Sequence, residues 1–276
     1  MSDPREFLAS NRAMWNEWVD INAGSDFYGL EEFRRGGTKL RPYELEEVGD
    51  VRGKTLLHLQ CHFGMDTLSW AREGAVVTGM DFSERGIEVA RGLAAELGIE
   101  AAFVYSDLYE LPNALEGQFD VVYTSRGALN WLPDIPRWGA VAAHFVRPGG
   151  VFYVTEAHPF LHVFDDELDE PFLRLRYPYW TREEPLAFEN VGSYADRSQP
   201  VTVPMEYDWN HSLGEIVTAV VQAGLRIDFL HEFDFLEWPM PPLTEESEDG
   251  LHRLPPGKFG EGELPLFFSL RASKPV

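Results

Sequence analysis

Polar residues follow three successive apolar runs in this chain, where together they could bind a nucleotide-like ligand. The segment 60–64 (QCHFG) follows the first run, and Asp81 and Asp107 end the second and third. If the runs are parallel strands, their carboxyl ends meet at one edge of a sheet, where ligands of such sheets bind. Each aspartate alone could equally be a helix cap or turn residue. The prediction of a ligand site therefore rests on the segment 60–64, Asp81 and Asp107 occurring together in this order.

The spacing of these residues fits the parts of such a ligand. Asp81 lies 81 − 64 = 17 positions after Gly64, close to where an acidic residue meets ribose hydroxyls in dinucleotide-binding folds. Asp107 could accept a hydrogen bond from an adenine amino group. The amides of 60–64 and of the helix start behind them could hold a carboxylate or phosphate.

Apolar runs and helical patterns alternate between residues 54 and 156, which is typical of a mostly parallel sheet with helices on both faces. The pattern predicts strands at 55–60, 76–81, 101–107, 119–125 and 151–156, and helices at about 66–72, 83–97 and 135–146. A helix with a Ser212–Glu215 capping box and two final strands, at 225–233 and 264–273, follow near the C-terminus. The fold class is thus α/β, with a doubly wound, mostly parallel sheet of seven strands.

Two further regions flank this core. Residues 1–50 predict an N-terminal helical cover, in which Ser10 caps a helix that carries Trp15 and Trp18 on one face. Residues 158–210 predict an inserted subdomain on the substrate side, with strands at 172–180 and 200–209 and a solvated acidic run at 165–170. The core then comprises 51–157 and 211–276, and the Pro-rich stretch 237–263 is expected to cover the site.

Composition excludes several classes of partner. The 276 residues carry a formal net charge of −23, which repels nucleic acid and anionic membranes and favours a small-molecule substrate. The single cysteine, Cys61, rules out an internal disulfide and suits a reducing compartment. Neither a signal pattern nor a run of transmembrane length is present in the sequence. We therefore expect a soluble, cytoplasmic protein, and the sequence leaves its oligomeric state open.

The segments LLHLQCHFG, VVTGMDFS, YSDLYELP and FDVVYTSRGALNWL with the later RPGG together resemble the successive motifs of class I S-adenosylmethionine-dependent methyltransferases. The resemblance covers about residues 55–156. It implies that Asp81 holds the ribose, that Asp107 with Leu108 addresses the adenine, and that residues 60–64 line the methionine moiety. The cofactor-binding set expected from motifs and resemblance together is Gln60, Cys61, His62, Gly64, Asp66, Thr67, Asp81, Phe82, Ser83, Asp107, Leu108 and Ser125.

The first motif departs from the family pattern. The family more often has an acidic residue followed by Gly-x-Gly-x-Gly, whereas this chain has His58, Gln60 and His62 in place of the acid and the first two glycines. We expect Gln60 and His62 to take an allowed backbone path slightly back from the ligand, with Gly64 at the closest approach. The same lack of glycine disfavours an NAD(P)-dependent oxidoreductase. That enzyme and a non-catalytic S-adenosylmethionine-binding protein are the alternatives to a methyltransferase.

The sequence also offers candidates for chemistry on the acceptor. His158, at the end of the fifth predicted strand, is the best placed general base, if the accepting atom must lose a proton. His158 and His162 are four residues apart, but without a third ligand they do not predict a metal site. The accepting atom, which could be O, N, S or C, is not identified by any motif. Substrate-side candidates are Trp15, Tyr28, Trp131, His162, Tyr207 and His211.

Overall fold

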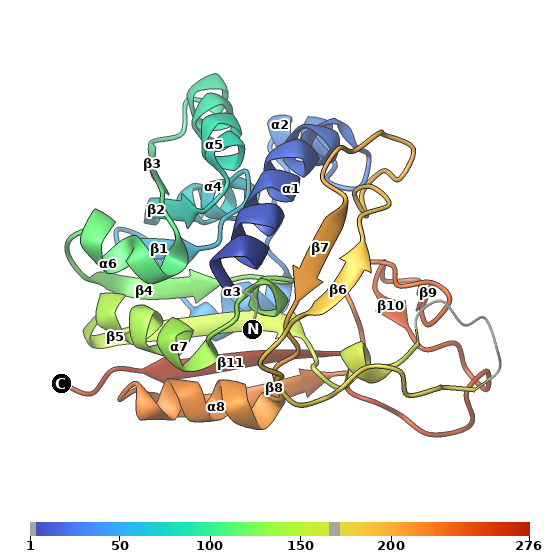
Figure 1. Cartoon of the computed structure of the whole chain (residues 1–276). Coiled ribbons are helices and arrows are strands. Elements are labelled where there is room, and N and C mark those ends of the chain that lie inside the picture. Colours follow the sequence, from blue (N-terminus) through green and yellow to red (C-terminus); the bar gives the residue numbers. More distant parts are fainter. Residues whose placement is uncertain (1–3, 166–171) are drawn as a thin grey trace.

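Seven strands form one sheet in the order β3-β2-β1-β4-β5-β11-β8 (Figure 1). The computed structural model describes residues 4–165 and 172–276. The sheet strands are β1 (Thr55–Leu59), β2 (Val76–Asp81), β3 (Ala101–Tyr105), β4 (Phe119–Thr124), β5 (Val146–Ala157), β8 (Arg226–Phe233) and β11 (Phe267–Ser273). The first five are parallel to one another, and β11 is antiparallel to both β5 and β8. The predicted mostly parallel, seven-stranded sheet is confirmed.

Helices cover both faces of this sheet because successive residues of each strand point to opposite sides. Leu57, Val122 and Val154 pack toward α7 (Ile135–Phe145) and α8 (Leu213–Gln222). Leu56 and Tyr123 belong to the cluster on the other face, beneath α3 (Pro42–Val48) and α4 (Met65–Arg72). The remaining helices are α1 (Pro4–Gly24), α2 (Leu30–Arg34), α3 (Pro42–Val48), α4 (Met65–Arg72), α5 (Glu84–Leu97) and α6 (Leu111–Ala114), with short turns η1 (Leu108–Glu110), η2 (Leu129–Trp131) and η3 (Leu161–Val163).

Local sequence signals set the ends of the helices nearest the site. Ser83 accepts a hydrogen bond from the Gly86 amide and so caps α5, as its position predicts. Ser212 and Glu215 form the predicted capping box of α8. Ser10 is not a cap, because α1 begins earlier, at Pro4, and the Ser10 hydroxyl donates instead to the Met205 carbonyl at 3.1 Å.

Residues 158–210, which we expected to form an inserted subdomain, contain a small two-stranded sheet of β6 (Leu186–Glu189) and β7 (Met205–Asp208), which stands beside α1 (Figure 1). The side chain of Asn11 bonds both the amide and the carbonyl of Tyr207 and so joins α1 to β7. The strand predicted at 172–180 is not formed, since within those residues only Leu175 makes a single bridge, to Phe164. Of the acidic run, Asp165 is 3% exposed and paired with two arginines rather than solvated, whereas residues 166–170 lie outside the described residues.

The Pro-rich stretch packs on the end of the sheet rather than projecting into solvent. It carries β9 (Glu245–Glu246) and β10 (His252–Arg253), and Trp238 contacts Phe267 with ring centroids 5.7 Å apart. Its Glu237 reaches into a buried cluster beside the candidate site. Among the helices within the described residues, none is long and apolar enough to cross a membrane.

Candidate functional site

The loop after β1 has a backbone path that glycine usually supplies. Gln60 and His62 have φ of 59° and 51°, and they are the only non-glycine residues with positive φ in the described part of the chain. Gly64 follows with a φ of 84°. The left-handed conformation disfavours residues with a Cβ atom, so this path is kept at a cost in conformational energy. The loop thus retains positive φ at all three positions where the family more often has glycine.

Gly64 is constrained by the protein interior. A Cβ atom built there would lie 2.9 Å from the Ala90 Cβ atom and from the Phe103 ring. Both neighbours belong to the buried cluster between α4, α5 and β3. The protein interior alone is therefore enough to require glycine at position 64, and the closest approach of the ligand there stays a prediction. Close packing and the positive φ account for it.

Asp81 joins this loop to the start of α5. One carboxylate oxygen accepts the His62 amide at 2.7 Å, and the other accepts the Ser83 amide at 2.8 Å. Burial raises the Asp81 pKa to about 7, although these backbone hydrogen bonds act in the opposite direction. Each oxygen has a second lone pair, which can accept a further hydrogen bond. Asp81 therefore holds the loop and could also bind hydroxyl groups at the strand end.

The neighbouring predicted residues differ in their exposure. Asp107 accepts the Tyr109 amide at 2.8 Å and is partly exposed, as is Phe82. Leu108 is only 4% exposed and lies in the main hydrophobic core. Ser83 is fully buried and donates to Asn16 of α1 at 2.7 Å. Asp107 and Phe82 therefore remain available to a ligand at this edge of the sheet. The side chains of Leu108 and Ser83 are buried beneath the same edge.

His58 replaces the family's acidic residue as a buried connector. Its Nδ1 lies 2.9 Å from the Thr67 hydroxyl and its Nε2 lies 3.0 Å from the Ser125 hydroxyl. All three side chains are less than 9% exposed, and Cys61 is also buried. His58 thereby ties β1 to α4 and to the end of β4. This arrangement gives Thr67 and Ser125 a supporting role around His58, and their predicted contact with the cofactor stays a prediction, as does that of Cys61.

The burial of His58 predicts a specific acid sensitivity. Desolvation lowers the His58 pKa to about 4, whereas an unfolded histidine titrates near 6.5. Between these values the unfolded chain binds a proton that the folded chain does not, so stability falls as the pH falls from about 6.5 to 4. In His58→Gln the slope of unfolding free energy against pH should become shallower by up to about 1.4 kcal/mol per pH unit.

Urea unfolding over this pH range measures the slope. His144→Gln serves as the matched control, because His144 is exposed on α7. Equal slopes for wild type and His58→Gln would show that His58 does not resist protonation in the folded protein.

Glu156, which motif reasoning did not select, organises the loop after β4. Its carboxylate accepts the amides of Gly127, Ala128 and Leu129 at 2.5, 2.7 and 3.1 Å, and its own neighbour's amide at 2.8 Å. Burial raises its pKa, and these four donors act against that shift. Its position at the end of a strand, like those of Asp81 and Asp107, was the sequence signal that could have found it.

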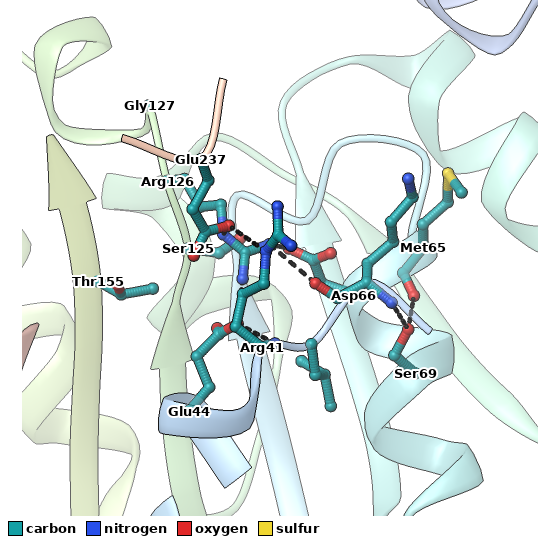
Figure 2. A network of polar contacts seen from close by, with 12 residues as sticks. Arg41, Glu44, Met65, Asp66, Ser69, Ser125, Arg126, Gly127, Thr155 and Glu237 are labelled. Atoms are coloured by element: carbon teal, nitrogen blue, oxygen red, sulfur yellow. Dashed lines mark hydrogen bonds and ion pairs between the residues drawn. The ribbon is translucent and has the colours of Figure 1, made fainter. Parts of the chain in front are cut away.

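A buried charge cluster lies on the other side of the same loop. Figure 2 shows Arg126 among Glu44 of α3, Asp66 of α4 and Glu237 of the Pro-rich stretch. Arg126 pairs with Glu44, with Glu237 at 2.7 Å and with Asp66 at 3.2 Å. Burial raises the Glu44 pKa to about 7, and Arg126 opposes this effect. Asp66 is therefore engaged in fixing the start of α4.

Several predicted substrate-side aromatic residues gather over the cofactor loop. The Trp15 ring lies 5.1 Å from the His62 ring and 5.3 Å from the Trp131 ring, and Tyr28 lies 5.3 Å from His62. Burial lowers the His62 pKa to about 3, so its ring is neutral. The His62 ring therefore belongs to this aromatic cover, with the Asn22 side chain 3.5 Å away.

The other candidates do not share this location. Nδ1 of His158 accepts the Phe160 amide at 3.1 Å, and its Nε2 lies 3.0 Å from Glu232 of β8. With both ring nitrogens engaged, the structure gives the predicted base role of His158 no support. His211 is held by Thr181 and by the Leu132 carbonyl, and Tyr207 packs on Phe7 of α1. His162 lines a separate cavity at the ends of β4 and β5.

Gln60 provides a test of whether the loop suits S-adenosylmethionine. Its Nε2 donates to the Ala128 carbonyl at 2.9 Å, which orients the amide. Its Oε1 is buried and has no hydrogen-bond partner among the described residues. A buried acceptor without a donor is unfavourable, and an ammonium group such as that of a methionine moiety would satisfy it. The loop therefore fits the cofactor at this point.

Comparison with known proteins identifies the same region. Residues 56–150 match the family model of a methyltransferase domain. The ubiquinone biosynthesis O-methyltransferase of Escherichia coli O127:H6 is 33% identical over 152 residues, which cover 54% of this chain and 60% of that protein. The protein of the same name from Serratia proteamaculans is 37% identical over 149 residues, or 54% and 59%. The chain thus spans about 60% of the length of these curated relatives.

Solved structures share this fold. An S-adenosylmethionine-dependent methyltransferase from Mesorhizobium loti aligns with a TM-score of 0.55 and 20% identity, over 84% of this chain and 95% of that one. At this identity the likeness concerns the fold alone. Residues 56–150 therefore match a methyltransferase domain and lie within a fold that this solved methyltransferase shares.

Proposed function

We propose that this chain transfers a methyl group from S-adenosylmethionine to a small-molecule acceptor. The observation that carries the proposal is the loop at the end of β1, whose positive φ at Gln60, His62 and Gly64 preserves the family's backbone path. The net charge of −23 favours a small molecule over nucleic acid. A cytoplasmic location is part of the proposal and rests on the single cysteine.

Different residues of this chain bind different parts of the cofactor. The free Oε1 of Gln60 accepts from the ammonium of the methionine moiety, while Asp81 and Asp107 accept from the ribose and adenine. When bound, the cofactor supplies a methyl group on a sulfonium, which is open to in-line displacement. Alignment of donor and acceptor then provides most of what the protein must contribute. The aromatic residues Trp15, Tyr28 and Trp131 exclude water above the loop.

Calorimetry distinguishes this function from its alternatives. S-adenosylhomocysteine is expected to bind, and NAD is not, because the loop lacks the glycines of a dinucleotide site. Binding of NAD with no response to S-adenosylhomocysteine would point to an oxidoreductase. Binding of S-adenosylmethionine without methyl transfer to any of a broad set of small molecules would favour a non-catalytic binding protein.

A further inference from the structure

A buried carboxylate at the end of β5 fixes the segment 127–129, which follows β4. The side chain of Glu156 is 4% exposed. Its two oxygens accept four backbone amides in pairs: Oε1 accepts those of Gly127 and Ala157, and Oε2 accepts those of Ala128 and Leu129. Hydrogen bonds to an ionised acceptor are roughly twice as strong as neutral ones. The carboxylate therefore sets the orientation of three successive peptide groups.

Two of these peptide groups direct their carbonyl oxygens to residues of the candidate site. Both are trans, so the N–H and the carbonyl of each point in opposite directions. The peptide group of residues 128–129 turns its N–H to Glu156 and its carbonyl oxygen to the Nε2 of Gln60, which lies 2.9 Å away. The preceding peptide group turns its carbonyl oxygen to the indole nitrogen of Trp131, at 2.8 Å. Glu156 thus holds the groups that orient Gln60 and Trp131.

The orientation of the Gln60 amide determines which of its atoms can meet a ligand. Because Nε2 donates to the Ala128 carbonyl, Oε1 occupies the other branch of the amide, where it is buried without a partner among the described residues. If the amide turned over, its NH₂ group would take the place of Oε1 and would present a donor to an ammonium group, which is itself only a donor. Acceptance of an ammonium therefore depends on the Ala128 carbonyl staying in place.

A neutral side chain of the same shape cannot hold these peptide groups. Glutamine has one acceptor oxygen, and its NH₂ group only donates. If the NH₂ group took the position of Oε1, the amides of Gly127 and Ala157 would face a donor. If it took the position of Oε2, the amides of Ala128 and Leu129 would do so. In either orientation the segment 127–129 loses part of its anchor.

We propose that Glu156 is a positioning residue of the cofactor site, which makes binding selective for a ligand with an ammonium group by fixing the amide of Gln60. It acts through the Ala128 carbonyl and does not touch the ligand. The proposal rests on the proposed function, since the ammonium concerned is that of the methionine moiety of S-adenosylmethionine.

Two ligands that differ only in the amino group measure this selectivity. Calorimetry gives the affinities of S-adenosylhomocysteine and of its deaminated analogue, in which a hydrogen atom replaces the amino group. Wild type should bind S-adenosylhomocysteine at least about tenfold more tightly, as one hydrogen bond to a charged group predicts. In Glu156→Gln this ratio should fall below about threefold, with less than about a threefold change for the deaminated analogue. A ratio that stays at the wild-type value, whether or not both affinities fall, would overturn the proposal.

A double-mutant cycle tests whether Glu156 acts through Gln60. Gln60→Ala removes Oε1 and should lower the ratio by itself. Adding Glu156→Gln to this variant should lower the ratio no further, because substitutions along one chain of contacts are not additive. Independent effects of the two substitutions on the ratio would contradict the proposed route.

Glu215→Gln is the matched control. The carboxylate of Glu215 also accepts a backbone amide, that of Ser212, but it does so at the start of α8. The affinity ratio in this variant should equal that of wild type. If it fell as in Glu156→Gln, the loss of selectivity would not be specific to the segment 127–129, and the proposal would fail.

The wild-type measurements separate the two levels of the argument. If wild type fails to bind S-adenosylhomocysteine, the proposed function itself fails. If it binds both ligands equally well, the ammonium contact of Gln60 and the role of Glu156 fail, while the methyltransferase function stands. Should Glu156→Gln not fold, Glu156→Asp provides the same test, since it keeps the charge but draws the carboxylate back by one methylene group. An unchanged ratio in Glu156→Asp would likewise overturn the proposal.

Discussion

Gly64→Ala is expected to destabilise the folded protein by about 2–5 kcal/mol, which combines the cost of a left-handed non-glycine residue with overpacking. The added methyl group would meet the Ala90 Cβ atom and the Phe103 ring at 2.9 Å, and the φ of 84° would persist because the loop is closed by the Asp81 carboxylate. Urea unfolding measures the loss. A larger side chain such as valine should prevent folding altogether.

Gly92→Ala is the matched control for this experiment. Gly92 lies in the interior of α5, is exposed, and has no atom within 4 Å of an added Cβ. Its replacement should stabilise the protein by about 0.8–1 kcal/mol, since alanine favours the helix. If Gly64→Ala were as stable as wild type, packing against α5 and β3 would not be the reason for glycine at this position. Close approach of the ligand would then be the remaining reason.

Arg126→Met is expected to cost about 3–5 kcal/mol of stability, the range for removing one partner from a buried ion pair. The arginine side chain is 14% exposed, and it balances Glu44 and Glu237, which are 0% and 5% exposed. Methionine fills similar space but leaves these carboxylates without their counter-ion. The loss should appear in urea unfolding and should loosen the start of α4 through Asp66.

The size of this loss should depend on pH. The Glu44 pKa is already raised to about 7, well above that of an unfolded glutamate. The folded chain thus binds a proton more readily than the unfolded chain, and stability falls as the pH rises through this value. Because removing Arg126 raises the pKa further, Arg126→Met should be least harmful near pH 5 and most harmful near pH 8.

Arg85→Met is the control at the surface. Arg85 pairs with Asp20 and Glu88, and its side chain is 44% exposed, so its loss should cost less than about 1 kcal/mol at any pH. Equal losses for the two arginine variants would mean that the Arg126 cluster is effectively solvated.

The parallel core could be predicted because each of its elements has a local signal. Alternating apolar runs and helix caps such as Ser83 and Ser212 depend on neighbours only a few residues away. The strand predicted at 172–180 was wrong because its alternation had no partner strand, while β6 formed at Leu186–Glu189 against β7. Ser10 does not cap a helix, because α1 begins at Pro4 and the Ser10 hydroxyl donates to the Met205 carbonyl.

The strand ends that make up the candidate site were predictable, whereas the contacts of the side chains there were less so. The strand-end rule selected Asp81 and Asp107, and it applied equally to Glu156. The cluster around Arg126 could not be read from spacing, since Glu44, Asp66 and Glu237 come from three distant segments. Nor does the sequence state that Gln60 and His62 adopt positive φ, because that region is usually reserved for glycine.

The links between α1 and the inserted region have a consequence for the order of assembly. Ser10, Asn11 and Glu17 bond Met205, Tyr207 and Thr202, each more than 180 positions later in the chain. At a synthesis rate of about 5–20 residues per second, the first helix waits roughly 10–40 s for these partners to leave the ribosome. During that interval Phe7 lacks the Tyr207 ring of β7, and Trp15 and Trp18 lack the Tyr194 ring. The nascent chain therefore carries these aromatic side chains of α1 without their late partners throughout most of its synthesis, so the docking of α1 is one of the last steps of folding.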